Sequence, residues 1–472
     1  MAYVAGATKW LGVGLLVALA ALIAGVLVQV APLSAVALPV VGLGAIAAAR
    51  WPAAAAGALF LLTGAYGSLA AFAGISAAIA VDALLAALWG ATIWSYLMHN
   101  TERPAWLWPG VALLVVYAGL TLVAMLLSPD VAVAARSFRA SGWYLMAALL
   151  IAYAPWFQDR RGELARAFLL VALLIGGYAT LRWIFGQSGT ETGYVLARSD
   201  NEVFNDKTRL FGSLLGGKQL AFWTAAAIPF CLACALTFRG RWRAVALAAA
   251  GACAVAMLGA DVRVAVEAVV PAVLLVLALY QLARGFPGLH LGATAGAALV
   301  IACIGAGAFA FTLADSPETG ERYRVLATSP TSDASYQARV FKWRTAFEDV
   351  EDHPLGQGLG ASGDIQQRFG RFANISTYDV DNSYLKIALE QGLPVMVLFG
   401  AALLALLLGL MRRAVLTLDP QRAGLAIGAA GTLVVFAIFM FAGTYVEGLP
   451  ALAAWMLIGL GIAGFSHRPE RR

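Results

Sequence analysis

Long uninterrupted apolar runs constrain this chain more than any other feature of its sequence. They recur along all 472 residues, and many are about 18 residues or longer. Every backbone polar group inside a bilayer needs an internal partner, so only helices and closed barrels can cross it. The runs are continuous and do not alternate with polar residues, which favours helices. The sequence therefore predicts an all-α, polytopic integral membrane protein.

The run lengths predict about 14 transmembrane helices. The first run follows only Lys9 and ends without a small-residue cleavage site, so we expect a retained span and not a signal peptide. The expected spans are Leu11–Val30, Leu33–Ala49, Pro52–Leu69, Ile75–Leu97, Trp106–Leu127, Trp143–Trp156, Leu164–Phe185, Gln219–Phe238, Ala244–Ala260, Val264–Leu282, Leu291–Leu313, Leu385–Met411, Gly424–Gly443 and Pro450–Phe465.

These spans predict a division of the chain into three parts. Residues 1–313 hold the first eleven helices with a shorter loop at 186–218, residues 314–384 form a large loop, and residues 385–472 hold the last helices. Loops longer than about 15 residues in compact proteins are usually functional or disordered. The aromatic residues in Ser335–Val350, which we expect to be helical, favour a folded helical cap over disorder.

The charge pattern predicts the orientation in the membrane. Only 12% of the residues are charged, and the net charge is +6. Arginines gather in alternate short connections, and the positive-inside rule places these connections and both termini in the cytoplasm. The two long loops then face the outside. Membrane topology explains the net positive charge better than nucleic-acid binding does. The arginines concerned are Arg50, Arg103, Arg160, Arg161, Arg166, Arg239, Arg241, Arg243, Arg284, Arg412, Arg413, Arg422, Arg468, Arg471 and Arg472.

Charged residues within the apolar runs are rare, and each is a candidate functional residue; Asp82, Arg182, Arg263 and Glu267 are the clearest cases. In the expected topology Asp82, Arg182, Arg263 and Glu267 all lie toward the outer ends of their helices. A transporter would place such groups near the middle of the membrane. Their position instead favours a cavity open to the outer leaflet, although a transporter of lipid-linked oligosaccharides is the alternative from a different functional class.

Cations near the outer surface predict an anionic ligand. Arg209, Lys218 and Arg263 lie nearest the membrane in the outer loops. Guanidinium groups suit phosphate oxygens, and each charge-assisted hydrogen bond contributes about 1.5–3 kcal/mol. A diphosphate at the headgroup level would engage several of them. The alternative is that these residues are interfacial anchors that contact lipid headgroups.

An acidic junction, Ser376–Gly392, ends the large loop and opens the next apolar helix. Asp379 and Asp381 stand at this junction, followed by Asn382 and Tyr384. The spacing of the two aspartates also resembles the metal-binding DxD motif of nucleotide-sugar enzymes. That motif needs a soluble metal-binding domain on the cytoplasmic side, so we discount a DxD metal site here.

Five motifs together resemble the O-antigen ligase and polymerase superfamily, over roughly Arg209–Leu460. No single motif is decisive, but their order and the large loop between late helices make the resemblance fairly specific. The motifs are Arg209–Gly212, the helix-opening Arg263, Arg339–Trp343, His353–Gly360 and Asp381–Gly392, with Glu447–Leu460 closing the segment.

The resemblance implies a GT-C type membrane glycosyltransferase of the bacterial inner membrane. Such enzymes transfer glycan from undecaprenyl diphosphate on the periplasmic side without a metal. In the ligases, a histidine immediately before the asparagine of the last motif is held to be the catalytic base. Asp381 occupies that position here. This departure favours a polymerase that joins lipid-linked repeat units, with transfer to lipid A–core or another acceptor by a ligase as the alternative. Whether a chain-length regulator also binds is left open by the sequence.

The chemistry assigns provisional roles to the remaining residues. A lipid diphosphate leaves readily once its charge is stabilised, so the reaction needs one base and not the two carboxylates of a glycosidase. Asp381 is the candidate base, and a helix N-cap is its alternative role. Asn382 and Tyr384 are candidates to position the acceptor sugar, although Asn382 suits loop backbone equally. Arg339 is a candidate to hold glycan or diphosphate, or else part of a solvated helix face.

Overall fold

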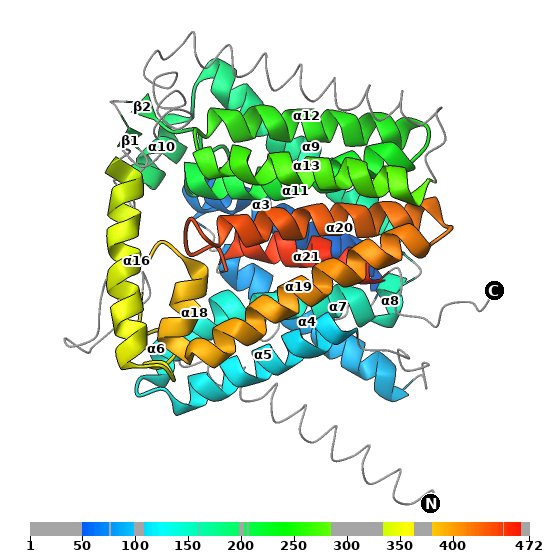
Figure 1. The fold of residues 1–472 in the computed structure, drawn as a ribbon. Coiled ribbons are helices and arrows are strands. Elements are labelled where there is room, and N and C mark those ends of the chain that lie inside the picture. The colour runs from blue at the N-terminus through cyan, green and yellow to red at the C-terminus, as the bar shows by residue number, and fades with distance from the viewer. Residues whose placement is uncertain are drawn as a thin grey trace, which may run out of the picture.

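The computed structural model describes residues 50–74, 77–98, 108–158, 160–197, 203–204, 207–284, 334–362, 380–446 and 448–463. Long helices run side by side through the molecule, and a further helix lies across their ends at one side (Figure 1). That helix is α16 (Ala334–Asp352), which confirms the helix expected at Ser335–Val350. Two-residue strands β1 (Val203–Phe204) and β2 (Lys207–Thr208) pair antiparallel beside the short helix α10 (Gly189–Leu196).

Nine helices in the described ranges are long and apolar enough to cross a membrane, so the chain is a multi-pass membrane protein. The expected spans Leu11–Val30, Leu33–Ala49 and Leu291–Leu313 lie outside the described residues, and the count of 14 therefore stays a prediction. The nine are α3 (Pro52–Ala73), α4 (Ala77–Met98), α5 (Pro109–Leu127), α9 (Arg161–Phe185), α11 (Gly217–Thr237), α12 (Arg241–Gly259), α13 (Arg263–Ala283), α19 (Leu393–Leu416) and α20 (Pro420–Phe439).

One of the expected spans begins much earlier than the sequence indicated. The helix expected over Trp143–Trp156 runs as α6 (Val131–Phe138), a π-helical turn η1 (Arg139–Trp143) and α7 (Tyr144–Tyr153), followed by the single turn α8 (Pro155–Gln158). Asp130 caps its start, with its carboxylate accepting from two backbone amides at 3.1 Å. Arg136 and Arg139 made the first half look like a loop, but the helix continues through both residues.

A second boundary differs because of a glycine. The span expected over Leu385–Met411 is two helices, α18 (Ser383–Gln391) and α19, which meet at Gly392 and diverge (Figure 1). Gly392 has φ +95°, where a side chain would be strained, and a Cβ there would stand 2.7 Å from the carbonyl carbon of Leu355. The chain therefore turns at this point, and only α19 is a candidate membrane span.

Helix α11 forms the centre of the bundle, since its apolar segment is wholly buried. Glycines on α20 let the two backbones approach closely: a Cβ at Gly428 would stand 2.9 Å from the Phe230 Cα, and one at Gly431 would stand 2.6 Å from Pro229. Small residues at such contacts are typical of helix packing in membranes. Helix α21 (Leu449–Ala463) is likewise buried throughout.

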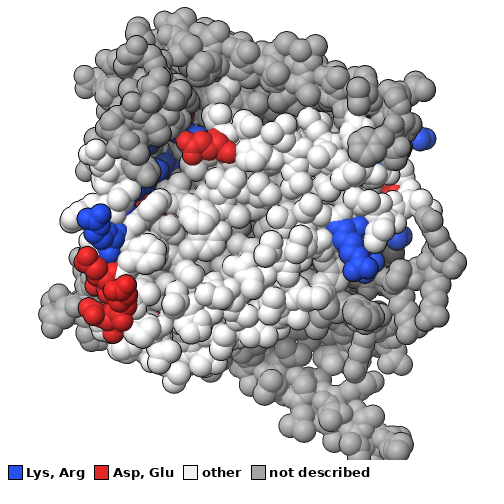
Figure 2. Space-filling model, in the orientation of Figure 1, with Lys and Arg blue, Asp and Glu red and all other residues white. Residues whose placement is uncertain are grey.

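Charged side chains gather at two opposite ends of the face drawn in Figure 2, and a wide uncharged band separates them. Exposed leucines such as Leu404 and Leu408 of α19 belong to the outward-facing surface of the bundle. Lipid tails can cover such a band without burying charge. The end that carries α16, α18 and the β1–β2 pair is called the α16 end below.

Candidate active site

Asp381 stands at the α16 end in an uncommon backbone conformation. Its φ is +48°, in the left-handed region that residues other than glycine seldom adopt. The next residue, Asn382, caps α18, because its side-chain oxygen accepts from the amides of Tyr384 and Leu385 at 2.9 and 3.1 Å. The helix cap is thus Asn382, and the alternative role that the sequence suggested for Asp381 is wrong. Strained residues of this kind cluster at functional sites.

Ser383 fixes the start of α18 to the turn that follows α20. Its backbone amide donates to the Met440 carbonyl at 2.7 Å, and its hydroxyl donates to the Gly443 carbonyl at 2.7 Å. The same hydroxyl accepts from the Val446 amide at 3.1 Å. Ser383 is fully buried. The backbone beside Asp381 is therefore attached to the α20–α21 turn by three hydrogen bonds.

Cations surround the carboxylate of Asp381. The Lys342 ammonium lies 2.7 Å from Asp381 Oδ2, and Lys342 and Arg339 are one turn apart on α16. Burial raises the pKa of Asp381, but the hydrogen bond from Lys342 and the charges of Lys218, Lys342 and Arg339 lower it further than burial raises it. The group is consequently an anion at neutral pH. Of the predicted site residues, the structure brings Lys218 and Arg339 toward Asp381, and it adds Lys342.

Lys342 was not singled out from the sequence. It belongs to the Arg339–Trp343 motif, but a lysine in a charged loop helix has no distinctive signal of its own. Only the packing of α16 across the helix ends brings it to the junction (Figure 1). We call Asp381, Lys218, Arg339 and Lys342 the junction cluster.

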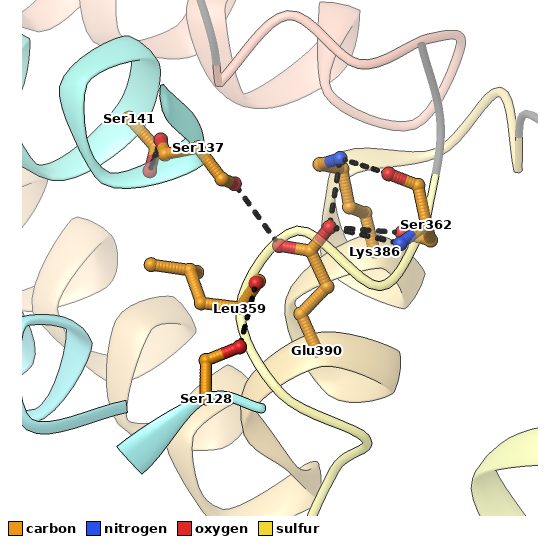
Figure 3. Close-up of polar contacts among 7 residues, drawn as sticks. All are labelled: Ser128, Ser137, Ser141, Leu359, Ser362, Lys386 and Glu390. Carbon is orange, nitrogen blue, oxygen red and sulfur yellow. Dashed lines mark hydrogen bonds and ion pairs between the residues drawn. The ribbon is translucent and has the colours of Figure 1, made fainter. Parts of the chain in front are cut away.

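A buried charge network holds the far half of α18 (Figure 3). The Lys386 ammonium lies 2.9 Å from Glu390 Oε1, and both side chains are at most 3% exposed. Glu390 also accepts from the amide and hydroxyl of Ser362 at 3.3 and 3.1 Å, and from the Ser137 hydroxyl of α6 at 3.3 Å. Lys386 donates to the Ser362 carbonyl at 2.9 Å. The network joins α18, α6 and the segment that contains Ser362.

The turn His353–Gly360 wraps the last residues of α18. Its Gln357 and Gly358 amides donate to the carbonyls of Leu389 and Glu390 at 2.7 and 3.0 Å. Gly356 has φ +88°, and a Cβ there would stand 2.6 Å from the amide nitrogen of Gly392. This close contact explains the glycine at position 356 of the motif. It gives the motif a structural role beside the junction.

Arg209 and Arg263 lie at the same end through a different set of elements. Arg209 is half-buried after β2, and its carbonyl accepts from the Gln187 side chain at 2.7 Å. Arg263 is the first residue of α13 and is half-buried. The two segments are adjacent, since a Cβ at Gly259 would stand 2.8 Å from the Leu210 side chain. Their expected role in binding a diphosphate stays a prediction.

The other charges expected at outer helix ends are partnered differently. Asp82 pairs with Arg139 of η1. Arg182 donates to the Tyr178 hydroxyl at 2.9 Å and lies 3.5 Å from Glu191, a fully buried carboxylate of α10 that the sequence did not reveal. Glu267 is exposed. Asp82 and Arg182 thus belong to two separate ion pairs.

Tyr384 packs against the rest of the bundle. Its hydroxyl donates to the Ala437 carbonyl of α20 at 3.2 Å, and its ring centroid lies 4.6 Å from that of Phe441. These contacts give Tyr384 a packing role, and the acceptor-positioning roles predicted for Tyr384, Asn382 and Arg339 stay predictions. Asp379 lies outside the described residues. Within the described ranges, no three His, Cys, Asp or Glu side chains gather as ligands for a metal.

Comparison with known families gives one match. Residues 208–400 match a family model described as O-Antigen ligase. The matched segment runs from the end of β2 into α19 and contains the junction cluster, Arg209 and Arg263. Comparison with curated proteins gives no match.

Proposed function

The chain belongs to the O-antigen ligase/polymerase superfamily, and we propose that this protein is a polysaccharide polymerase of that superfamily. It transfers a glycan from undecaprenyl diphosphate to a sugar hydroxyl of another lipid-linked repeat unit. The glycan formed is an O-antigen or an exopolysaccharide. This places it among the membrane glycosyltransferases of the GT-C type, with no metal in the reaction.

The observation that carries the proposal is the junction cluster. A carboxylate, Asp381, is held in a strained backbone conformation among Lys218, Arg339 and Lys342. Transfer from a lipid diphosphate needs a hydrogen-bond acceptor for the attacking hydroxyl and cations for the departing diphosphate. The cluster supplies both kinds of group at one end of an apolar bundle. Arg209 and Arg263 extend the set of cations at that end.

The reaction is a single displacement. The acceptor hydroxyl oxygen forms a bond to the anomeric carbon as the bond from that carbon to the diphosphate oxygen breaks. The electron pair of the broken bond stays on the diphosphate, where the cations stabilise it, and the hydroxyl proton passes to Asp381. One displacement inverts the anomeric centre. No acid is required, because the diphosphate leaves without protonation.

A carboxylate with a lowered pKa is a weak base, and we expect donor binding to raise the pKa of Asp381. In the resting site, Lys218, Arg339 and Lys342 lower the pKa of Asp381 despite its burial. A bound diphosphate engages the same cations and offsets their effect on Asp381. The pKa of Asp381 then rises toward its usual range, so the base gains strength only when a donor is present.

The charge distribution supports an orientation with the α16 end in the periplasm of a bacterium and the chain in the inner membrane. The opposite end carries arginines at the helix termini, among them Arg161, Arg241, Arg284 and Arg413. Positive residues concentrate on the cytoplasmic side of such proteins. Both termini are then cytoplasmic, and the site meets the lipid-linked substrate after it has crossed the membrane.

A ligase is the second candidate, because the matched family model is described as O-Antigen ligase. A ligase would deliver a finished glycan to lipid A–core or to another acceptor. The two activities need the same donor site and differ in the acceptor. Asp381 in the position of the ligase histidine favours the polymerase.

Purified protein given one substrate, the undecaprenyl-diphosphate repeat unit, tests the proposal. We expect a ladder of lipid-linked oligomers, resolved by size. Asp381→Asn should remain folded and lose about 10²- to 10⁴-fold in rate, while Asp352→Asn, at an exposed carboxylate of α16, should match the wild type. Transfer that appears only after lipid A–core is added would establish the ligase instead. Wild-type turnover by Asp381→Asn would remove Asp381 from the reaction.

A further inference from the structure

Arg139 and Asp82 form an ion pair at the α16 end that the reaction described above does not use. Asp82 lies on α4 with its side chain 6% exposed, whereas Arg139 opens η1 and is 34% exposed. The Arg139 Nε–H donates to Asp82 Oδ2. The Tyr144 hydroxyl also lies beside the pair. The Asp82 contact uses Nε, and a guanidinium carries four further N–H groups on its two terminal nitrogens.

The backbone at Arg139 is unusual for a bundle helix. Residues 139–143 form a π-helical turn inside an otherwise α-helical segment. Such turns insert an extra residue into the helix and occur frequently at functional sites. Here Ser141, Gly142 and Trp143 are buried, while Arg139 keeps a third of its surface accessible. The extra residue allows an accessible guanidinium in a helix whose neighbouring side chains are packed.

Two hydrogen bonds hold the segment that carries Arg139, one to α18 and one to Gly448. Two residues before Arg139, the Ser137 hydroxyl donates to Glu390 of α18 at 3.3 Å (Figure 3). One residue after it, the Ala140 carbonyl accepts from the Gly448 amide at 3.1 Å. Gly448 follows the α20–α21 turn that holds Ser383. Arg139 therefore lies on a segment that is fixed on both sides to the elements that position Asp381.

A polymerase handles two lipid diphosphates at once. The donor loses its diphosphate during the reaction, but the acceptor keeps its own. The junction cluster provides cations for the first. The acceptor diphosphate is also negatively charged and lies at the level of the lipid headgroups. An oriented guanidinium is well suited to bind phosphate oxygens there.

We propose that Arg139 binds the diphosphate of the acceptor substrate and that Asp82 is the positioning residue that orients it. The inference rests on the proposed polymerase function. Asp82 fixes the guanidinium plane through Nε and offsets its charge while the site is empty. The terminal N–H groups then meet the phosphate oxygens without a change of rotamer, which limits the entropy lost on binding.

The test varies the acceptor and keeps a labelled donor constant. One acceptor is a lipid-linked repeat unit with a methylene in place of the anomeric oxygen, so that it cannot donate. The other is the same glycan as an alkyl glycoside without phosphate. The variant Asp82→Leu/Arg139→Met replaces the pair by apolar side chains, a change that usually leaves stability unharmed. Arg136→Gln, on the same helix and also half-buried, is the matched control.

For Asp82→Leu/Arg139→Met, we expect the KM for the diphosphate acceptor to rise about ten- to a hundredfold. The KM for the alkyl glycoside and the kcat with either acceptor should stay unchanged, and Arg136→Gln should match the wild type throughout. Equal changes for both acceptors, or no change for either, would show that the pair is only structural. A raised KM for the donor would overturn the assignment to the acceptor.

Direct binding separates failure of this inference from failure of the proposed function. If the wild type forms no oligomers, the polymerase proposal fails. Binding of the carbon-linked diphosphate acceptor, followed by tryptophan fluorescence, still compares the two proteins. Weaker binding by a folded Asp82→Leu/Arg139→Met variant supports the phosphate site, and equal binding overturns it. The charge-reversed variant Asp82→Arg/Arg139→Asp should restore the ion pair but not the binding.

Discussion

Removing one member of the buried Lys386–Glu390 pair should destabilise the α16 end far more than removing both. In Lys386→Met the Glu390 carboxylate keeps its hydrogen bonds to Ser362 and Ser137 but loses its only ionic partner among the described residues. The group is 2% exposed and cannot recover the loss from water. An uncompensated buried charge of this kind costs about 3–5 kcal/mol.

The double variant Lys386→Met/Glu390→Gln removes both charges and keeps an oxygen that can accept from Ser362, while its amide nitrogen can donate to the Ser137 hydroxyl. We expect it to recover roughly 2 kcal/mol relative to Lys386→Met, and with Glu390→Gln as the second single variant a double-mutant cycle gives the coupling energy of the pair. The single variant should also lower kcat, because α18 carries the backbone beside Asp381.

The free energy of unfolding is measured reversibly in mixed micelles of a mild detergent and dodecyl sulfate. Lys386→Met with wild-type stability would refute the reasoning, since it would mean that water reaches Glu390. A double variant no more stable than Lys386→Met would refute the charge argument and leave packing as the cause. Arg344→Gln, at an exposed position of α16, serves as the control.

Three further changes probe the same region. Lys342→Met removes a cation that lowers the pKa of Asp381, so that pKa should rise and the acid limb of the kcat/KM profile should move to higher pH. In the wild type this limb should lie below pH 3.8, the ordinary Asp value. An acid limb that does not move in Lys342→Met would exclude Asp381 as its source. Asn382→Ala removes the cap of α18 and should destabilise the protein by about 1 kcal/mol, with Asn382→Ser largely retaining stability; equal losses in thermal unfolding would argue against capping. Gly392→Ala places a Cβ against Leu355 at φ +95° and should destabilise the protein by about 1–3 kcal/mol. Gly400→Ala is the control, because a Cβ there meets nothing within 4 Å and should not destabilise the protein. Similar unfolding midpoints for the two variants would show that the turn relaxes.

The membrane helices were largely predictable, because hydrophobic length determines a span almost by itself. The two misplaced boundaries have causes that hydropathy does not register. At Gly392 a positive φ separates two helices, and the hydropathy of the flanking apolar residues joined them into one span despite Glu390 and Gln391 just before the glycine. At Arg139 an ion pair with Asp82, far away in sequence, lets a helix continue through a charged residue. Both causes are contacts between distant segments.

The candidate site was predictable in its location and only partly in its members. The motif order pointed to Asp381, and the matched family segment contains it. The sequence could not decide between Asp381 and Asn382 as the cap, since either residue suits that position. Lys342 and Glu191 became apparent only through tertiary packing: α16 brings one to Asp381, and α10 buries the other against Tyr178 and Arg182.

Because the helix breaks at Gly392, the geometry of the reaction centre does not depend on the thickness of the bilayer. A long apolar helix such as α19 adjusts to thinner or thicker lipid by changing its tilt. Helix α18 does not have to follow, because Ser383 attaches it to the α20–α21 turn and Glu390 attaches it to α6. The distance between Asp381 and its cations should then stay constant as acyl chains lengthen, and turnover should vary little between short-chain and long-chain lipids.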